Sequence, residues 1–179
     1  MSKIISPNLL DNLELLRTQE EKIRTDSCLL LNSQEFLSGR IKLVHACMDM
    51  LIWIYSRTND KELDDKSIAT AGLRIRLFNS IASCLKLLLA GYYQGSVSSI
   101  RDILEISFLL DYFTLDNTSI ERWIKNHEAK EFRPVNIRTE LDKRNGLSEQ
   151  KRKHRYKLLS TYGTHASYDG NRLLITTIY

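Results

Sequence analysis

Apolar side chains recur at helical spacing along almost the whole chain, and this pattern restricts the fold more than any other feature. Strand-like alternation is nearly absent before the last ten residues. Only two prolines and seven glycines interrupt the 179 residues, so few positions force the chain out of a helix. The pattern predicts an all-α bundle of five to seven helices. A chain of this length is near the usual size of one domain, so we expect a single domain over residues 1–179.

Capping signals and breaks in the periodicity delimit the individual helices. Asn32 with Glu35 has the spacing of an N-terminal capping box, and Thr118 with Glu121 repeats that spacing. The segment 26–31 between the first two apolar patterns is interpreted as a linker. The predicted helices cover residues 7–25, 32–57, 67–90, 96–113, 118–130, 135–144 and 148–161.

One helix and the tail bear on self-association. The helix predicted over 32–57 is apolar on nearly every side, so we expect it to form the core with the two helices that follow. The closing LLITTIY is rich in β-branched residues and predicts a short C-terminal strand, which has no partner in the same chain. An unpaired strand and the apolar surfaces of two long helices indicate a homodimer. The strand is equally compatible with a longer protein of which this sequence is a part.

Cysteine usage and hydropathy favour a cytoplasmic protein. The three cysteines are an odd number without short spacing, which is typical of buried thiols in a reducing compartment. The longest apolar stretches fall short of the ~20 residues that a membrane span requires, and the N-terminus lacks the apolar core of a secretory signal. Because the apolar stretches are short, we also expect no membrane contact. Gly-rich phosphate loops and metal-ligand motifs are absent, so we expect no metal and no cofactor.

Positive charge is concentrated in a basic subregion of about residues 122–161. The whole chain carries +4, whereas residues 122–157 hold 12 Lys and Arg against 5 Asp and Glu. The densest run is KRKHRYK, where Tyr156 lies among the cations. Basic and aromatic residues together suit the backbone and bases of a nucleic acid, although a charged run on a short helix is more often a solvated face. The candidate RNA-binding residues are Lys151, Arg152, Lys153, Arg155 and Lys157.

Two charges lie inside the otherwise apolar stretch of residues 91–113. Arg101 and Glu105 are four residues apart, which places them about 40° apart around a helix axis. Because their helix is apolar on most sides, we expect both side chains to be at least partly buried and matched by neighbours. They form either a structural ion pair or an anion-binding group, Arg101, held in place by Glu105.

Three stretches of the chain, GYYQGSVSSIRDILEISFLLDYF, IERWIKNH and LLSTYGTHASYDG, resemble an uncharacterised family of bacterial all-helical proteins. That family is grouped with the HEPN-like bundles (higher eukaryote and prokaryote nucleotide-binding). Its members carry an R-x-x-x-E element after a glycine-containing turn, and a later Ser followed by a His. The matching positions are Arg101, Glu105, Ser160 and His165. The resemblance implies a helical bundle and makes Arg101, Glu105 and His165 candidate catalytic residues.

Ribonucleases of the HEPN group use an Arg and a His with four to six residues between them and need no metal. Arg122 and His127 have this spacing and are the alternative catalytic pair. Arg40 and His45 share it, and about one such pair is expected by chance, so spacing alone carries little information.

Two functions follow as hypotheses. The first is a binding or regulatory module, of the kind found in bacterial defence or toxin–antitoxin systems, that applies its basic side to RNA or to an acidic protein. The alternative is a metal-independent HEPN-type ribonuclease.

Overall fold

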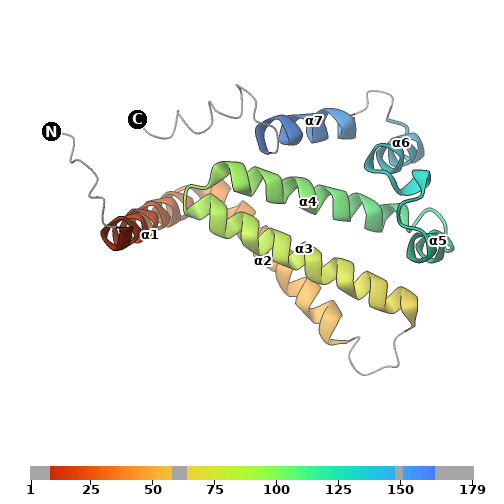
Figure 1. The fold of residues 1–179 in the computed structure, drawn as a ribbon, viewed down its shortest axis with the longest axis horizontal. Helices are drawn as coiled ribbons and strands as arrows, with labels where there is room; N and C mark the ends of the chain where they lie inside the picture. The colour runs from red at the N-terminus through yellow and green to blue at the C-terminus, as the bar shows by residue number, and fades with distance from the viewer. Residues whose placement is uncertain (1–8, 58–63, 148–150, 164–179) are drawn as a thin grey trace.

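The computed structural model describes residues 9–57, 64–147 and 151–163 (Figure 1). These ranges form an all-α bundle without strands, and the predicted C-terminal strand lies outside them. None of their helices combines the length and the apolar character that crossing a membrane requires. The elements are α1 (Leu9–Ser33), α2 (Glu35–Ser56), α3 (Asp65–Leu89), α4 (Tyr93–Tyr112), α5 (Ser119–Lys125), the 3-10 helix η1 (Lys130–Phe132), α6 (Pro134–Arg144) and α7 (Lys151–Gly163).

Several predicted helix boundaries are wrong. The segment 26–31 continues α1 to Ser33, since it contains neither Gly nor Pro to break the helix. The N-cap of α2 is Gln34 rather than Asn32, and its side chain makes no capping hydrogen bond. Thr118 does precede α5, but its hydroxyl donates to the Asp116 carboxylate instead of capping the helix. The expected helix over 118–130 ends at 125 and is followed by η1.

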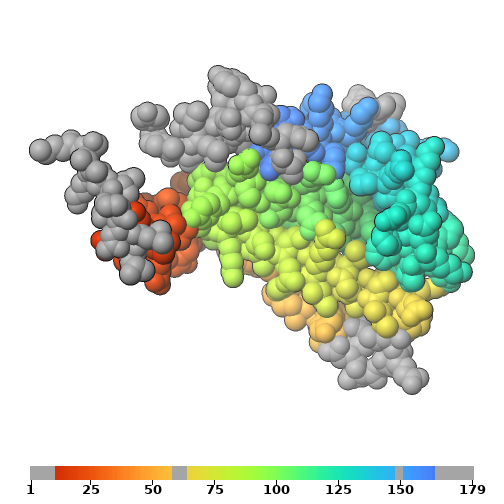
Figure 2. All heavy atoms as spheres, viewed as in Figure 1, coloured from red at the N-terminus to blue at the C-terminus, as the bar shows by residue number. Residues whose placement is uncertain are grey.

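The long helices α3 and α4 lie side by side at the centre of the bundle (Figure 1). Helices α6 and α7 pack on α4, whereas α5 packs on α3. Helix α2 packs on α3, and α1 contacts α2 and α3 at one end of the molecule. Helix α7 thus lies on the opposite side of α4 from α3 in Figure 1, and Figure 2 shows it at the surface.

The best-buried apolar cluster lies where α4, η1 and α6 meet. Leu141 is fully buried, and Tyr112 and Phe132 meet edge to face with ring centroids 6.1 Å apart. Ile137 completes the buried cluster, and half-buried side chains of α4 and α5 pack around it. This corner fixes α6 on α4 and therefore also the position of α7, which contacts both helices.

Small residues let α3 and α4 approach closely. Ser96 is fully buried, and its Oγ lies 3.3 Å from Cys84 Sγ. A Cβ added at Gly95 would lie 3.2 Å from Leu87 Cδ1, a tight contact. Cys84 is therefore a buried thiol, as predicted, whereas the prediction is wrong for the exposed Cys47.

Helix α2 is not the core helix that its composition predicts. Within the single chain only Leu51 of this helix is buried, while Phe36 is 67% and Leu43 is 66% exposed. An apolar surface on every side requires cover, but the periodicity does not say whether the same chain supplies it. Helices α1 and α2 together expose Leu13, Leu15, Leu16, Ile23, Leu29, Leu30, Phe36, Leu43, Met50, Ile52, Trp53 and Tyr55.

Candidate functional site

The charged pair of α4 meets a tyrosine of α7. Arg101 Nε lies 3.1 Å from Glu105 Oε1, as the four-residue spacing predicts. The same Nε donates to the Tyr156 hydroxyl at 2.8 Å, and this hydroxyl donates to Glu105 Oε1. The three side chains form a closed hydrogen-bonded cluster that joins α7 to α4.

This cluster is half-buried and its charges are matched. The side chains of Arg101 and Glu105 are 31% and 30% exposed, so the expected partial burial is confirmed. Burial and the hydrogen bond to Glu105 raise the pKa of Tyr156, which keeps its hydroxyl protonated and able to donate. This arrangement agrees with the interpretation of Arg101 and Glu105 as a structural ion pair, because the Glu105 carboxylate and the Tyr156 hydroxyl already compensate the Arg101 guanidinium.

Tyr156 is held inside the basic run rather than presented to solvent. Besides its hydrogen bonds, its ring lies under two guanidinium groups, with Arg138 Cζ 3.9 Å and Arg101 Cζ 4.9 Å from the ring centroid. A ring that is already stacked is not available to stack on a nucleobase. The basic run therefore offers charge rather than base stacking.

Arg152 is also turned into the bundle. Its Nη1 lies 2.5 Å from Asp142 Oδ1 of α6, and the two side chains are only 16% and 10% exposed. Its guanidinium also lies 5.7 Å from the centre of the Phe108 ring. Arg152 thus joins α7 to α6 and α4, and the Asp142 carboxylate already neutralises its charge.

Most of the other cations of the basic subregion are exposed. Four of the five candidate RNA-binding residues on α7 are exposed, namely Lys151, Lys153, Arg155 and Lys157. Lys125, Lys130, Arg133 and Lys143 are exposed as well. With Arg144, which pairs with Asp111, nine cations within residues 122–157 are therefore exposed.

The end of α7 lies directly against α4. A Cβ added at Gly163 would lie 2.9 Å from the Ser98 backbone nitrogen and 3.0 Å from Val97 Cγ1. Real Cβ atoms essentially never come that close to backbone, so this contact requires glycine. Both ends of α7 are thus fixed to the bundle, which determines the side of the helix that faces outward.

Arg122, one of the alternative catalytic residues, is engaged by two carboxylates. Its Nη1 lies 2.6 Å from Asp116 Oδ2, and its Nε lies 3.1 Å from Glu131 Oε1. The hydrogen bonds from Arg122 and Thr118 lower the pKa of Asp116 to about 2. An arginine compensated in this way has little charge left for a phosphate.

The other members of the predicted catalytic pairs are dispersed. The ring of His127 lies against Trp123, with centroids 6.5 Å apart, and follows the end of α5. Arg40 and His45 are exposed on α2. Ser160 is half-buried on α7, whereas His165 lies outside the described residues, so its proximity to Arg101 and Glu105 stays a prediction.

A small cavity lies between α3, α4 and α6, and none of the sequence motifs predicts it. Its volume is about 160 Å³, and its wall is largely apolar. Arg138 of α6 lines it and is only 8% exposed, yet its Nε and Nη1 have no hydrogen-bond partner among the described residues. A buried donor without a partner costs about 1–3 kcal/mol, and more when it is charged. In the sequence, Arg138 lies three residues before Leu141, and residues with this spacing share one face of a helix. This spacing is the one sequence signal that indicates the burial of Arg138.

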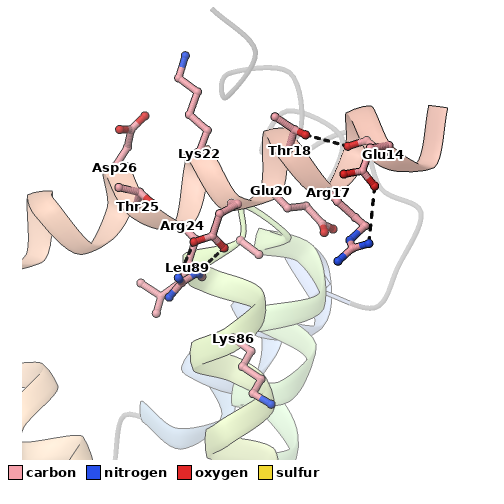
Figure 3. A pocket seen from close by; sticks show the side chains of 12 residues that line it. Glu14, Arg17, Thr18, Glu20, Lys22, Arg24, Thr25, Asp26, Lys86 and Leu89 are labelled. Carbon is pink, nitrogen blue, oxygen red and sulfur yellow. Dashed lines mark hydrogen bonds and ion pairs between the residues drawn. The ribbon is translucent and has the colours of Figure 1, made fainter. Parts of the chain in front are cut away.

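A larger hollow of about 980 Å³ between α1 and the end of α3 is open to solvent (Figure 3). Four acidic and four basic side chains line it, so their charges cancel. Arg24 pairs with Glu21 on the same helix, and Lys22 and Asp26 point away from α3 in Figure 3. The hollow is a groove of solvated ion pairs without an excess charge that would select a ligand.

No family model, curated protein or solved structure matches this chain. The resemblance to the HEPN-like bundles therefore stays a prediction.

Proposed function

We propose that the protein is a helical binding or regulatory module that binds single-stranded RNA on the outer face of α7. The observation that carries the proposal is the division of the basic run into two sides. Arg152 pairs with Asp142 of α6, and Tyr156 donates a hydrogen bond to Glu105 of α4. The four cations of α7 other than Arg152 are exposed. An exposed group of cations on a fixed helix is the electrostatic footprint of a polyanion-binding surface.

The arrangement of these cations favours RNA over an acidic protein. At 100° per residue, Lys151 and Arg155 form one row along α7, and Lys153 and Lys157 form a second row. The exposed His154 lies between the rows. A flexible phosphate backbone that crosses the helix can contact both rows, whereas a flat acidic surface contacts one. Tyr156 is engaged elsewhere, so we expect backbone contacts and little sequence preference.

Incubation with labelled single-stranded RNA in EDTA tests the proposal. We expect a shifted band on a native gel at low salt, and RNA of full length on a denaturing gel. Degradation that His127→Ala or His165→Ala abolishes would instead support the metal-independent ribonuclease. Binding of poly-glutamate without binding of RNA would contradict the proposal and favour an acidic protein partner.

We further propose that the exposed apolar surface of α1 and α2 is covered by a second copy of the chain. Twelve large apolar side chains on these two helices are at least 39% exposed. Apolar surface of this extent on adjacent helices is typical of an interaction site. Helices α1 and α2 lie away from α7 in Figure 1, so a dimer formed through them leaves the cations of α7 accessible.

Light scattering after size-exclusion chromatography measures the mass in solution, which we expect to be twice that of one chain. Phe36→Glu with Leu43→Glu should reduce the mass to that of one chain, because two charges would be buried without partners. Val135→Glu is the control, since Val135 is 50% exposed on α6 and should leave the mass unchanged. A wild-type protein with the mass of one chain would refute the dimer.

A further inference from the structure

We propose that the cavity lined by Arg138 binds a small organic monocarboxylate, whose carboxylate accepts hydrogen bonds from the Arg138 guanidinium. Two independent observations coincide at this place. One is the cavity itself, about 160 Å³ between α3, α4 and α6. The other is a guanidinium that is more than nine-tenths buried in the wall of that cavity, with Nε and Nη1 unsatisfied within the described part of the chain. Buried polar groups are normally hydrogen-bonded, and an orphaned charged donor indicates an acceptor that is supplied from outside.

Neighbouring carboxylates do not supply this acceptor, because each is engaged by another cation. The Asp102 carboxylate accepts hydrogen bonds from Arg76 and, at 2.5 Å, from Ser80 Oγ. Burial raises the pKa of Asp102, but the hydrogen bonds and the charge of Arg76 outweigh burial, so the pKa lies below its ordinary value. The other two carboxylates are bound as described above, Glu105 by Arg101 and Tyr156, and Asp142 by Arg152. Asp102 and Glu105 lie on α4, whereas Asp142 lies on α6, the helix that carries Arg138.

The charge balance around the cavity selects a single negative charge. Three carboxylates in this region face four guanidinium groups, so one positive charge is left over. A monoanion neutralises this charge. A phosphate dianion would leave an excess negative charge among Asp102 and Glu105, which also line the cavity, and such like-charge crowding is unfavourable.

The wall of the cavity favours a ligand with a short apolar body. The apolar lining comes from α3, α4, α5, η1 and α6 and includes Ile106, Phe108, Leu109, Trp123, Phe132 and Ile137. Drug-sized ligands occupy pockets of about 300–1,000 Å³, so this smaller space suits a compound of a few carbon atoms. Arg138 would bind the carboxylate, and the apolar side chains would enclose the remainder.

Tryptophan fluorescence reports on this site directly. The chain has two tryptophans, and Trp123 lines the cavity whereas Trp53 is 54% exposed on α2. In a Trp53→Phe background the emission therefore comes from Trp123. We expect sodium butyrate to change this emission saturably. The uncharged isostere butyramide and inorganic phosphate should each bind about ten- to a hundredfold more weakly, the ratio expected for hydrogen bonds to a charged group.

Arg138→Met in the same background removes the donors and keeps an apolar chain of similar length. We expect this variant to fold, since a thioether chain can keep the apolar contact with the Tyr156 ring and removes two buried donors that lack a hydrogen bond within the described residues, and to lose the butyrate response. Arg133→Gln is the control, because Arg133 is exposed beside the same helix and does not line the cavity. It should respond like the parent protein.

Three results would overturn the proposal: no saturable response to butyrate, equal binding of butyramide or phosphate, or an unchanged response in Arg138→Met. The first two are measured on protein with intact Arg138. They decide the question even if Arg138→Met fails to fold.

Discussion

Arg155→Glu combined with Lys157→Glu is expected to weaken binding of single-stranded RNA by roughly ten- to a hundredfold at low salt, because both cations give up phosphate contacts and then repel the strand. The two residues belong to different rows on the exposed side of α7, so the double change affects both rows. Fluorescence anisotropy of a labelled RNA measures the affinity. Helix content by circular dichroism should not change, since neither side chain is buried.

Lys22→Glu combined with Lys42→Glu is the matched control. Both lysines are exposed, on α1 and α2, and the pair changes the net charge by the same amount, from +4 to zero. If affinity depends on the α7 surface, the control should bind nearly as well as the wild type. An equal loss in both variants would show that overall charge, and not the outer face of α7, attracts the RNA.

Asp142→Asn is expected to destabilise the protein by about 3–5 kcal/mol, the usual effect of removing one partner of a buried ion pair. The Asp142 and Arg152 side chains are 10% and 16% exposed, so water would compensate Arg152 poorly after the change. Arg138, four residues from Asp142 on the same helix, adds a second buried cation to this region. The free energy of unfolding from a urea titration measures the effect.

Asp111→Asn provides the comparison for Asp142→Asn. Asp111 pairs with Arg144 at 2.8 Å, but these side chains are 37% and 35% exposed. Solvent screens such a pair, so we expect a loss of less than about 1 kcal/mol. Equal effects of the two substitutions would mean that the contact between α6 and α7 is not buried in solution.

The helical secondary structure and the ion pair of Arg101 with Glu105 could be predicted from the sequence, because both depend on contacts between residues that are close in the chain. The four-residue spacing of Arg101 and Glu105 implies their contact once the segment is helical. Tyr156 completes the same cluster from 55 residues further along the chain. Nothing local connects it to Arg101, because this contact depends on how α7 packs on α4.

Burial was harder to predict than secondary structure. The apolar residues of α2 indicated a core helix. Their pattern shows only that the apolar surface must pack against something, and α3 buries little of that surface within the single chain. The opposite error concerns Arg138. An arginine in a short, polar helix suggests exposure, but Ile137 and Leu141 carry it into the interior beside the cavity. Similarly, counting charge in KRKHRYK could not separate Arg152, which binds Asp142, from the cations that face solvent.

The salt dependence of RNA binding by the wild-type protein tests the central claim most directly. If four exposed cations of α7 contact phosphates, a plot of the logarithm of the affinity against the logarithm of the salt concentration should be linear. Its slope should be about −3, because each phosphate contact on a single strand contributes roughly −0.7. Absence of binding at low salt, or an affinity that salt leaves unchanged, would contradict the assignment of this surface to RNA.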